Sequence, residues 1–304
     1  MTEHFVQPPR WEWYILAYFF FGGLAAGCYI LATMLRLWGA REDRLIGRIG
    51  YLVAFPLVLI CPILLTIDLG KPLRFYHMLF STTPGAPGLM FKPWSPMSLG
   101  TWALLLFGIF SFVSFVEALT PRVSARRRKG RGPTTLRFII DILGGILGLY
   151  VASYTGVLLS VSNQPVWSDT WALGGLFLAS ALSGSAALLA WIARRRGAEI
   201  TEMRLAGADG YFALLELLML AIFFLNLAEA GTLSRTSTGP WLLLWLLVLV
   251  CILPPIVGVY RRGRAAAAGR PARFAVAGNA TLAAGIVLAG VLLMRFVVIF
   301  SAQL

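Results

Sequence analysis

The chain has 304 residues, of which 59% are apolar and only 13% are charged. So few charged side chains cannot solvate the surface of a soluble protein of this size, which excludes a water-soluble enzyme or binding module. The formal net charge of +13 would suit nucleic acid, but the basic residues lie in short segments between apolar runs. That placement reports membrane topology, and no nucleic-acid partner is expected.

Apolar runs of about 20 residues recur along the chain, the length at which a helix crosses the hydrocarbon core of a bilayer. The sequence therefore predicts an all-α, multi-pass protein of the lipid bilayer with eight transmembrane helices. We expect residues 1–137 and 138–304 to form one integral membrane domain from two four-helix bundles. The expected helices are Tyr14–Leu37, Ile49–Leu69, Leu99–Leu119, Phe138–Val161, Trp171–Ala193, Tyr211–Leu233, Trp241–Tyr260 and Phe274–Phe300.

The segments between these spans alternate in basic content. Residues 36–48, 122–137, 194–204 and 261–273 hold 20 of the 26 lysines and arginines. Basic loops stay on the cytoplasmic side of a membrane, so both termini are predicted on the outer side, periplasmic in a Gram-negative cell. The expected location is the inner (cytoplasmic) membrane, with the long loop 70–97 facing outward.

Two short matches suggest an internal repeat. Gly22-Gly23-Leu24 in the first span resembles Gly174-Gly175-Leu176 in the fifth. Asp68-Leu69-Gly70 at the end of the second span resembles Glu229-Ala230-Gly231 at the end of the sixth. Four spans per half preserve orientation, so a repeat would give two parallel four-helix bundles, although matches this short also arise by chance.

The residues that hold metals are scarce. The chain has two histidines, His4 and His77, whereas a membrane haem is usually held by histidines on facing helices. The three cysteines, Cys28, Cys61 and Cys251, lie far apart and form no C-x-x-C motif. We therefore expect no haem, no iron–sulfur cluster and no metal site in this chain.

One segment concentrates ionisable groups at the end of an apolar run. Asp68 ends the second span, and Lys71, Arg74 and His77 follow within nine residues. An ionisable group at the membrane border needs a partner or a function. A salt bridge from Asp68 to Lys71 or Arg74 is the structural interpretation. In the functional one, Asp68 and His77 exchange protons and the two cations tune them or bind a partner.

Tyr154 carries a hydroxyl into the apolar, outward half of the fourth span, and Trp167 follows in the next outer loop. Two interpretations of Tyr154 stay open. It is either a packing residue whose hydroxyl binds a backbone carbonyl, or a ligand for a polar headgroup.

Several other charges lie within the expected spans. Ordinary pairing with Arg122, Arg137 or Arg204 is expected for three acids near basic helix ends, namely Glu117, Asp141 and Asp209. Glu216 lies deeper, with no cation nearby in sequence, and is either a partnered bundle residue or part of a proton path. Arg295, inside the last span, is expected to pair with an acid on another helix, and Glu229 is the candidate.

Four stretches carry a resemblance to a known family. They are Trp11–Gly27, Asp68–Met78, Trp94–Trp102 and Tyr154–Trp167. With the eight spans, they resemble the membrane-subunit family of polysulfide reductase and formate-dependent nitrite reductase, the NrfD/PsrC-like proteins, over essentially the whole chain. Hydrophobicity does not dictate polar residues in fixed order at a span end, which makes the second and third stretches specific.

The resemblance implies electron exchange between the quinone pool, menaquinone or ubiquinone, and a partner iron–sulfur protein of the four-cluster type. That partner usually serves a molybdopterin or multihaem catalytic subunit. The implied quinone site lies near the outer face in the first four spans, with Asp68, His77 and Tyr154 as the catalytic residues.

Other residues complete the expected site. Tyr18 is the evident polar side chain of the first span, and Arg74 and Trp167 are expected to contact the quinone. Lys71, Arg74 and Lys92 suit docking to an acidic partner face.

Two other functional classes stay open. One is a secondary transporter with four coupling residues: Asp68, Glu216, Glu229 and Arg295. Helices broken at Cys61-Pro62 or Leu253-Pro254-Pro255 would favour it. The other class is a passive anchor that tethers a redox partner.

Overall fold

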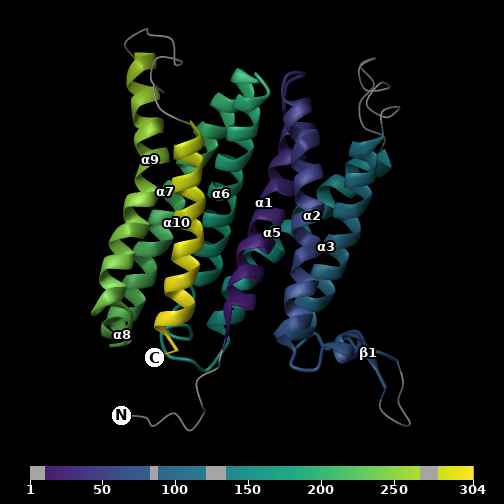
Figure 1. Ribbon diagram of the computed structural model, residues 1–304, viewed down its shortest axis with the longest axis vertical. Coiled ribbons are helices and arrows are strands. Elements are labelled where there is room, and N and C mark those ends of the chain that lie inside the picture. The colour runs from purple at the N-terminus through teal and green to yellow at the C-terminus, as the bar shows by residue number, and fades with distance from the viewer. Residues whose placement is uncertain (1–10, 83–87, 121–134, 268–279, 304) are drawn as a thin grey trace.

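The computed structural model describes residues 11–82, 88–120, 135–267 and 280–303. Eight of its helices are long and apolar enough to cross a membrane, as expected (Figure 1). They are α1 (Trp13–Leu37), α2 (Arg44–Asp68), α3 (Pro96–Leu119), α5 (Thr135–Ser160), α6 (Leu173–Arg195), α7 (Glu199–Glu229), α9 (Pro240–Ala267) and α10 (Ala280–Ser301). The short elements are the 3₁₀ helix η1 (Pro72–Met78), strands β1 (Phe80–Ser81) and β2 (Gly88–Leu89), and helix α8 (Leu233–Ser237).

The predicted sixth span differs most from its helix. Helix α7 begins at Glu199 rather than Tyr211, and it ends at Glu229 rather than Leu233. The acids Glu199 and Glu202 in its first turn stabilise the positive end of the helix dipole, yet they are too polar to extend an apolar run. The helix therefore continues beyond the hydrophobic segment.

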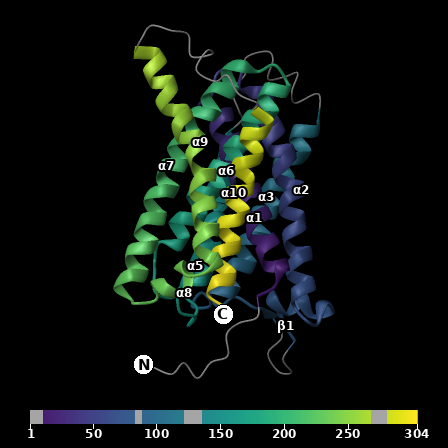
Figure 2. The ribbon, with the colours of Figure 1, turned by 60° about the vertical axis from the view of Figure 1, so that its left-hand side comes forward.

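Helices α1 and α6 lie at the centre of the molecule (Figures 1 and 2). Most of their membrane-spanning residues are buried, and α1 contacts α2, α5, α6 and α10. Small residues allow this crowding: a Cβ added at Gly27 would lie 2.7 Å from the Ala181 carbonyl oxygen and 2.8 Å from Ser185 Cβ. Contact between α1 and α6 thus joins the first half (α1, α2, α3, α5) to the second half (α6, α7, α9, α10).

The start of α1 and the end of α10 lie at the same end of the molecule (Figure 1). The Trp11 N–H donates to Gln303 Oε1 at 2.8 Å, and Gln303 Nε2 donates to the Trp11 carbonyl at 3.2 Å. We call this the Asp68 end, because α2 finishes there, and the opposite one the Asp43 end. The assignment of the Asp68 end to the outer side of the membrane stays a prediction from the basic loops.

The loop connecting α1 to α2 is tied to the second half at the Asp43 end. Asp43 is fully buried and accepts a hydrogen bond from Thr201 Oγ1 of α7 at 2.7 Å. Arg204 of α7 forms an ion pair with the same carboxylate. A buried acid so satisfied fixes the α1–α2 loop on α7.

The two acid-containing tripeptides of the suggested repeat end their helices alike. Gly70 and Gly231 each follow the C-cap residue, of α2 and α7 respectively, and have positive φ angles of 66° and 74°. Glycine adopts this conformation without steric cost, so it stops each helix. The prolines whose breaks would have favoured a transporter do not interrupt their helices: α2 continues through Pro62, and α9 through Pro254.

Candidate functional site

Tyr154 is buried where α5 meets the start of α3. Its hydroxyl donates to the Pro96 carbonyl at 2.7 Å, and the Tyr150 ring stacks on it with centroids 5.6 Å apart. Gly100 makes room for this contact, because a Cβ there would overlap the Tyr154 hydroxyl. The structural interpretation of Tyr154, a packing residue bonded to a carbonyl, is confirmed, whereas its role toward a headgroup stays a prediction.

Tyr18 of α1 lies close to Tyr154. Its side chain is 4% exposed and lies near Cys61 of α2 and Tyr154. Gly22 lies beside Cys61 and Tyr18, since a Cβ added there would be 3.5 Å from Cys61 Sγ and 3.7 Å from the Tyr18 ring. The Tyr18 hydroxyl makes no hydrogen bond within the described part of the chain. It is not among the fully enclosed atoms that lack a partner, so it borders open space and can bind an incoming acceptor.

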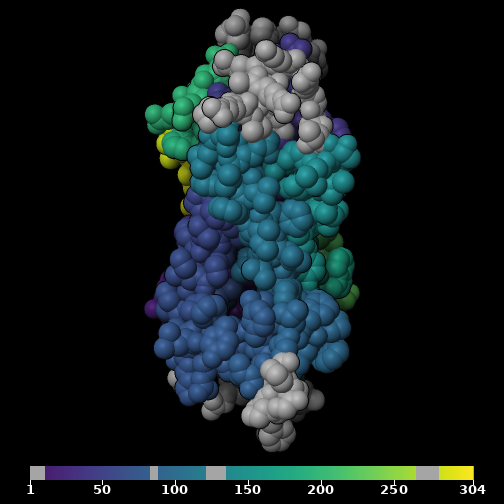
Figure 3. All heavy atoms as spheres, turned by 90° about the vertical axis from the view of Figure 1, so that its right-hand side faces the viewer, coloured from purple at the N-terminus to yellow at the C-terminus, as the bar shows by residue number. Residues whose placement is uncertain are grey.

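Figure 3 shows a hollow in the surface between α2 and α3, in the part of the molecule next to the η1 segment. At 1.5 Å per residue, Tyr18 and Tyr154 lie roughly 10 Å inside the ends of α1 and α5. The Tyr18–Tyr154 pair, with Gly22, Cys61 and Gly100 around it, therefore lies within the helices, near the Asp68 end. We call these five residues the Tyr18 pocket.

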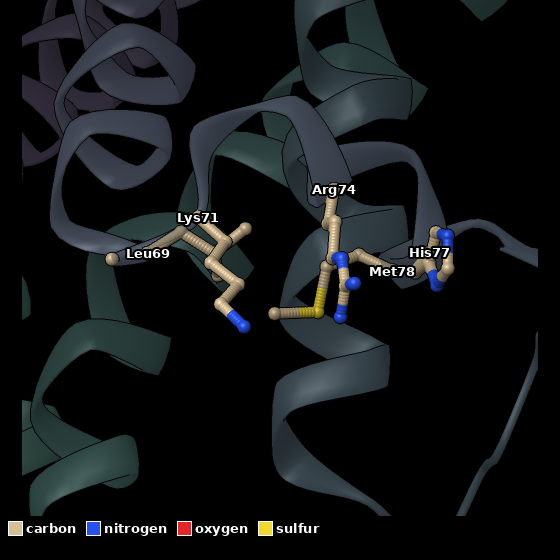
Figure 4. Close-up of a pocket in the computed structure, with 6 residues that line it drawn as sticks. Leu69, Lys71, Arg74, His77 and Met78 are labelled. Carbon is tan, nitrogen blue, oxygen red and sulfur yellow. The ribbon is translucent and has the colours of Figure 1, made fainter.

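Six residues between positions 69 and 78 line an open groove of about 580 Å³ at the Asp68 end (Figure 4). They are Leu69, Gly70, Lys71, Arg74, His77 and Met78. Figure 4 shows the Met78 thioether between the side chains of Lys71 and Arg74, with His77 on the far side of Arg74. The His77 ring contacts Tyr76 edge to face, with ring centroids 4.4 Å apart. The structure thus brings Lys71, Arg74 and His77 together.

Asp68 is exposed at the last position of α2, next to this groove. Among the described residues it forms neither a hydrogen bond nor an ion pair, so the salt bridge to Lys71 or Arg74 is not observed. The positive φ of Gly70 redirects the backbone after the helix, which breaks the helical spacing that would bring a cation back to Asp68. Lys92 is also exposed, on the segment before α3.

Trp167 has a packing role in the structure. It is completely buried, its indole N–H donates to the Val298 carbonyl at 2.7 Å, and its ring packs on Trp11 with centroids 4.9 Å apart. Its contacts therefore fasten the loop after α5 to α10 and to the segment before α1. The expected contact between Trp167 and a quinone stays a prediction without support from these contacts.

Four charged residues of the first half form a closed ring near the Asp43 end. Arg36 contacts Glu117 at 2.7 Å and Asp141 at 3.0 Å, while Arg137 contacts Glu117 at 2.5 Å and Asp141 at 2.8 Å. The Tyr51 hydroxyl donates to Asp141 at 3.1 Å. Pairing of Glu117 and Asp141 with Arg137 is confirmed, whereas Arg122 lies outside the described residues. Sequence reasoning missed Arg36, because no local spacing connects it to α3 and α5.

The expected pair of Asp209 with Arg204 is wrong. Asp209 accepts a hydrogen bond from Ser183 of α6 at 2.6 Å, and Arg204 pairs with Asp43 instead. Five residues along a helix correspond to a rotation of roughly 140° beyond a full turn, so the two side chains leave α7 in different directions. Arg262 of α9 is the cation that interacts electrostatically with Asp209.

The expected pair of Arg295 with Glu229 is also wrong. Glu229 is exposed at the end of α7, and no ion pair joins it to Arg295 in the described structure. The fully buried Arg295 donates to Ser180 Oγ at 2.8 Å and to the Phe177 carbonyl at 3.2 Å. The acid that interacts electrostatically with Arg295 is Glu216.

Comparison with known proteins agrees with this architecture. The family model described as "Polysulphide reductase, NrfD" matches residues 2–304. The sequence is 28% identical to a polysulfide reductase chain of Wolinella succinogenes, over 96% of this protein and 94% of that one. It is 25% identical to protein NrfD of Escherichia coli, over 97% of this protein and 95% of that one.

A shorter match covers 76 residues of a selenate reductase subunit of Mesobacillus selenatarsenatis, at 33% identity. That match spans 25% of this protein and 18% of that one, so it adds little. The family model covers nearly the whole chain, including all eight membrane helices and both groups of site residues. The chain therefore belongs to the NrfD family of multi-pass membrane proteins.

Proposed function

We propose that this chain is the membrane-anchoring, quinone-reactive subunit of a respiratory oxidoreductase complex, without haem of its own. It would exchange electrons between menaquinol or ubiquinol and a partner iron–sulfur subunit. The observation that carries the proposal is the hydroxyl of the buried Tyr18 side chain, which has no hydrogen-bond partner among the described residues and lies near Tyr154. Membership of the NrfD family, whose relatives include a polysulfide reductase chain, supports it.

The Tyr18 pocket fits a quinone headgroup in two respects. It offers a phenol donor that has no partner among the described residues, and it is otherwise lined by small or apolar groups. A bound quinone would supply reversible two-electron, two-proton chemistry. Tyr18 would donate a hydrogen bond to a ring oxygen, and Tyr154 would form the opposite wall. Asp68 and His77, at the membrane border, would hold and pass protons to and from water.

The loop at the Asp68 end suits a partner surface. Leu73 is 88% exposed and Trp94 is 78% exposed, although both lie beyond the spanning helices. The exposed cations Lys71, Arg74 and Lys92 lie on the same loop. An apolar surface that carries cations favours a partner with an acidic, partly apolar face. We assign this surface to a four-cluster iron–sulfur protein, which would serve a molybdopterin or multihaem catalytic subunit.

We further propose that the Asp68 end faces the periplasm from the inner membrane, and that the domain consists of two four-helix bundles. The basic-loop rule supports the first statement. Helix contacts support the second: α3 contacts α2 and α5, which both contact α1. In the second half, α7 contacts α6 and α9, which both contact α10.

Binding of a short-chain menaquinone analogue to the purified chain in lipid nanodiscs tests the site. Tyr18→Phe should weaken binding roughly tenfold, because loss of one hydrogen bond of about 1.4 kcal/mol changes a dissociation constant by that factor. Tyr14→Phe, an exposed tyrosine one turn earlier on α1, is the matched control and should bind like wild type.

Catalysis is tested in the assembled complex. Asp68→Asn should slow quinol oxidation while leaving the subunits associated, because the variant keeps the shape but cannot hold a proton. Unchanged binding in Tyr18→Phe together with unchanged turnover in Asp68→Asn would contradict the site. A protein that binds its partner but no quinone analogue would be a passive anchor, and one that moves a solute would be a transporter.

A further inference from the structure

Glu216 is a buried acid that the Tyr18 pocket does not use. It lies in the middle of α7, its side chain is 2% exposed, and it makes no hydrogen bond within the described residues. Some polar side-chain atoms are fully enclosed and have no hydrogen-bond partner, and Arg295 Nε is one of them. The two carboxylate oxygens of Glu216 are not in this group. The Glu216 oxygens therefore border space that a water molecule can reach. A membrane-embedded acid in this state is costly and marks a functional group.

Polar groups extend from Glu216 toward the Asp43 end. Asp209 lies two turns earlier on the same helix, roughly 10 Å away along the axis, and interacts electrostatically with Glu216. Ser183 of α6 donates to Asp209, and Arg262 of α9 interacts with it from the other side. Asp209 is 6% exposed and lies ten residues into α7, roughly 15 Å from its start. These groups are the polar side chains between the Asp43 end and the middle of the second half.

Arg295 of α10 is the cation next to Glu216. It interacts electrostatically with Glu216, and Ser180 and the Phe177 carbonyl hold its guanidinium. The guanidinium also lies against α1, since a Cβ at Gly23 would be 2.9 Å from Arg295 Nη2. The neighbouring Gly22 faces the Tyr18 pocket. The cation beside Glu216 is thus separated from that pocket by α1 alone.

We propose that Glu216 is a proton-exchange site in the second half, connected to the Asp43 end through Asp209. A hydronium ion at that end gives its proton to the Asp209 carboxylate. A water molecule passes the proton on to Glu216, whose carboxylate becomes a neutral acid. Release reverses the same steps. Arg295 stabilises the ionised form of Glu216, so the charge of this pair changes by one unit with each proton.

One other titratable group lies at the depth of Glu216: the free thiol of Cys251 on α9, since Gly210 of α7 meets Pro255 and Val259 of α9 and Phe223 meets Trp245, which makes the two helices antiparallel. On α6, Ser183 binds Asp209 and Ser180 binds Arg295, the cation on α10. The charged residues of α9 are at its C-terminal end, where Arg262 meets Asp209. Helix α8 contributes the exposed Arg235 at the Asp68 end. The charged groups of the site are therefore Asp209, Glu216 and Arg295, and the Cys251 thiol is a neutral neighbour.

Infrared difference spectra of the full-length protein in lipid vesicles, between acidic and alkaline buffer, test the proposal. Wild type should show the carbonyl band of a protonated carboxylic acid that disappears in Glu216→Gln. Glu229→Gln, which removes an exposed acid from the end of the same helix, is the matched control and should keep the band. Glu216→Asp should shift the band and not remove it, which separates loss of the acid from failure to fold.

The route is tested by the rate at which the band shifts when vesicles are mixed with heavy water. Asp209→Asn should slow this exchange roughly tenfold or more, because the variant cannot carry a proton. A band that survives in Glu216→Gln would overturn the site, and unchanged exchange in Asp209→Asn would overturn the route. Neither measurement uses a quinone, so failure here is distinct from failure of the Tyr18 pocket.

Discussion

The two halves of the membrane domain bury their charged side chains in different ways. In the first half, Arg36, Arg137, Glu117 and Asp141 alternate in a closed ring, and each carboxylate touches both arginines. In the second half the charges are spread along the helices, with hydroxyls and backbone carbonyls as their direct partners. Each charge of the ring is paired with two of opposite sign, so a proton gained or lost by one residue leaves a buried charge unpaired, and the ring stabilises the fold in one protonation state. Asp209 and Glu216 form no direct ion pair in the described structure, so the charge of one of them can change more easily.

Breaking the ring should have the largest effect. Asp141→Ala leaves Arg36 and Arg137 facing Glu117 alone, and removal of one partner of a buried ion pair costs about 3–5 kcal/mol. Unfolding of the purified protein in detergent measures the loss. The double variant Asp141→Leu with Arg137→Met should recover part of it, because it removes one charge of each sign. A single variant as stable as wild type would refute the structural role of the ring.

Weakening the contact between the two halves should have the second-largest effect on stability. Gly27→Val places a branched side chain against Ala181 and Ser185, and overpacking of this kind costs about 3 kcal/mol. Gly108→Val is the matched control, because a Cβ at Gly108 of α3 meets no atom within 4 Å. Thermal unfolding should show a lower midpoint for the Gly27 variant than for the Gly108 variant. Equal midpoints would contradict close packing of α1 on α6.

The electrostatic coupling between Arg295 and Glu216 should have a smaller effect on the free energy of unfolding. Arg295→Met and Glu216→Gln should each change stability, and the double variant should differ from their sum by about 1–2 kcal/mol. This interaction energy arises because each charge loses its electrostatic partner in the single variants. A double-mutant cycle of unfolding free energies measures it. Additivity would mean that Arg295 does not stabilise ionised Glu216.

The smallest difference should lie within the Tyr18 pocket. Tyr154→Phe loses the hydrogen bond to the Pro96 carbonyl and should cost about 1 kcal/mol of stability. Tyr18→Phe removes a hydroxyl that has no partner among the described residues, so it should leave stability unchanged or slightly higher. Unfolding of the two variants side by side checks this. Equal losses would show that both hydroxyls are already bonded.

Much of the fold follows from hydropathy, because the membrane requires long apolar helices at every crossing. All eight were predicted, and the largest error, at the start of α7, arose from a polar helical turn outside the apolar run. The pair Arg137–Asp141 was predictable from its spacing of four residues. Arg36 joined the ring from a distant segment, which no single-sequence pattern reveals.

The candidate site was predictable only in part. The resemblance in sequence pointed to Tyr18, Asp68, His77 and Tyr154, and the structure places the two tyrosines near each other on the packed helices α1 and α5. The Pro96 carbonyl that holds Tyr154 is a backbone atom, so residue types gave no signal for it. The free state of Asp68 depends on the conformation of Gly70, which local charge spacing does not encode.

The buried Asp43 has a mechanical consequence. With Thr201 and Arg204 it fastens the α1–α2 loop to α7 at one end of the domain, while Trp11 and Gln303 fasten α1 to α10 at the other. Links at both ends hold the two halves against the rocking motion that an alternating-access transporter requires. The proposed exchange of protons and electrons needs no such motion and suits a framework that holds its shape.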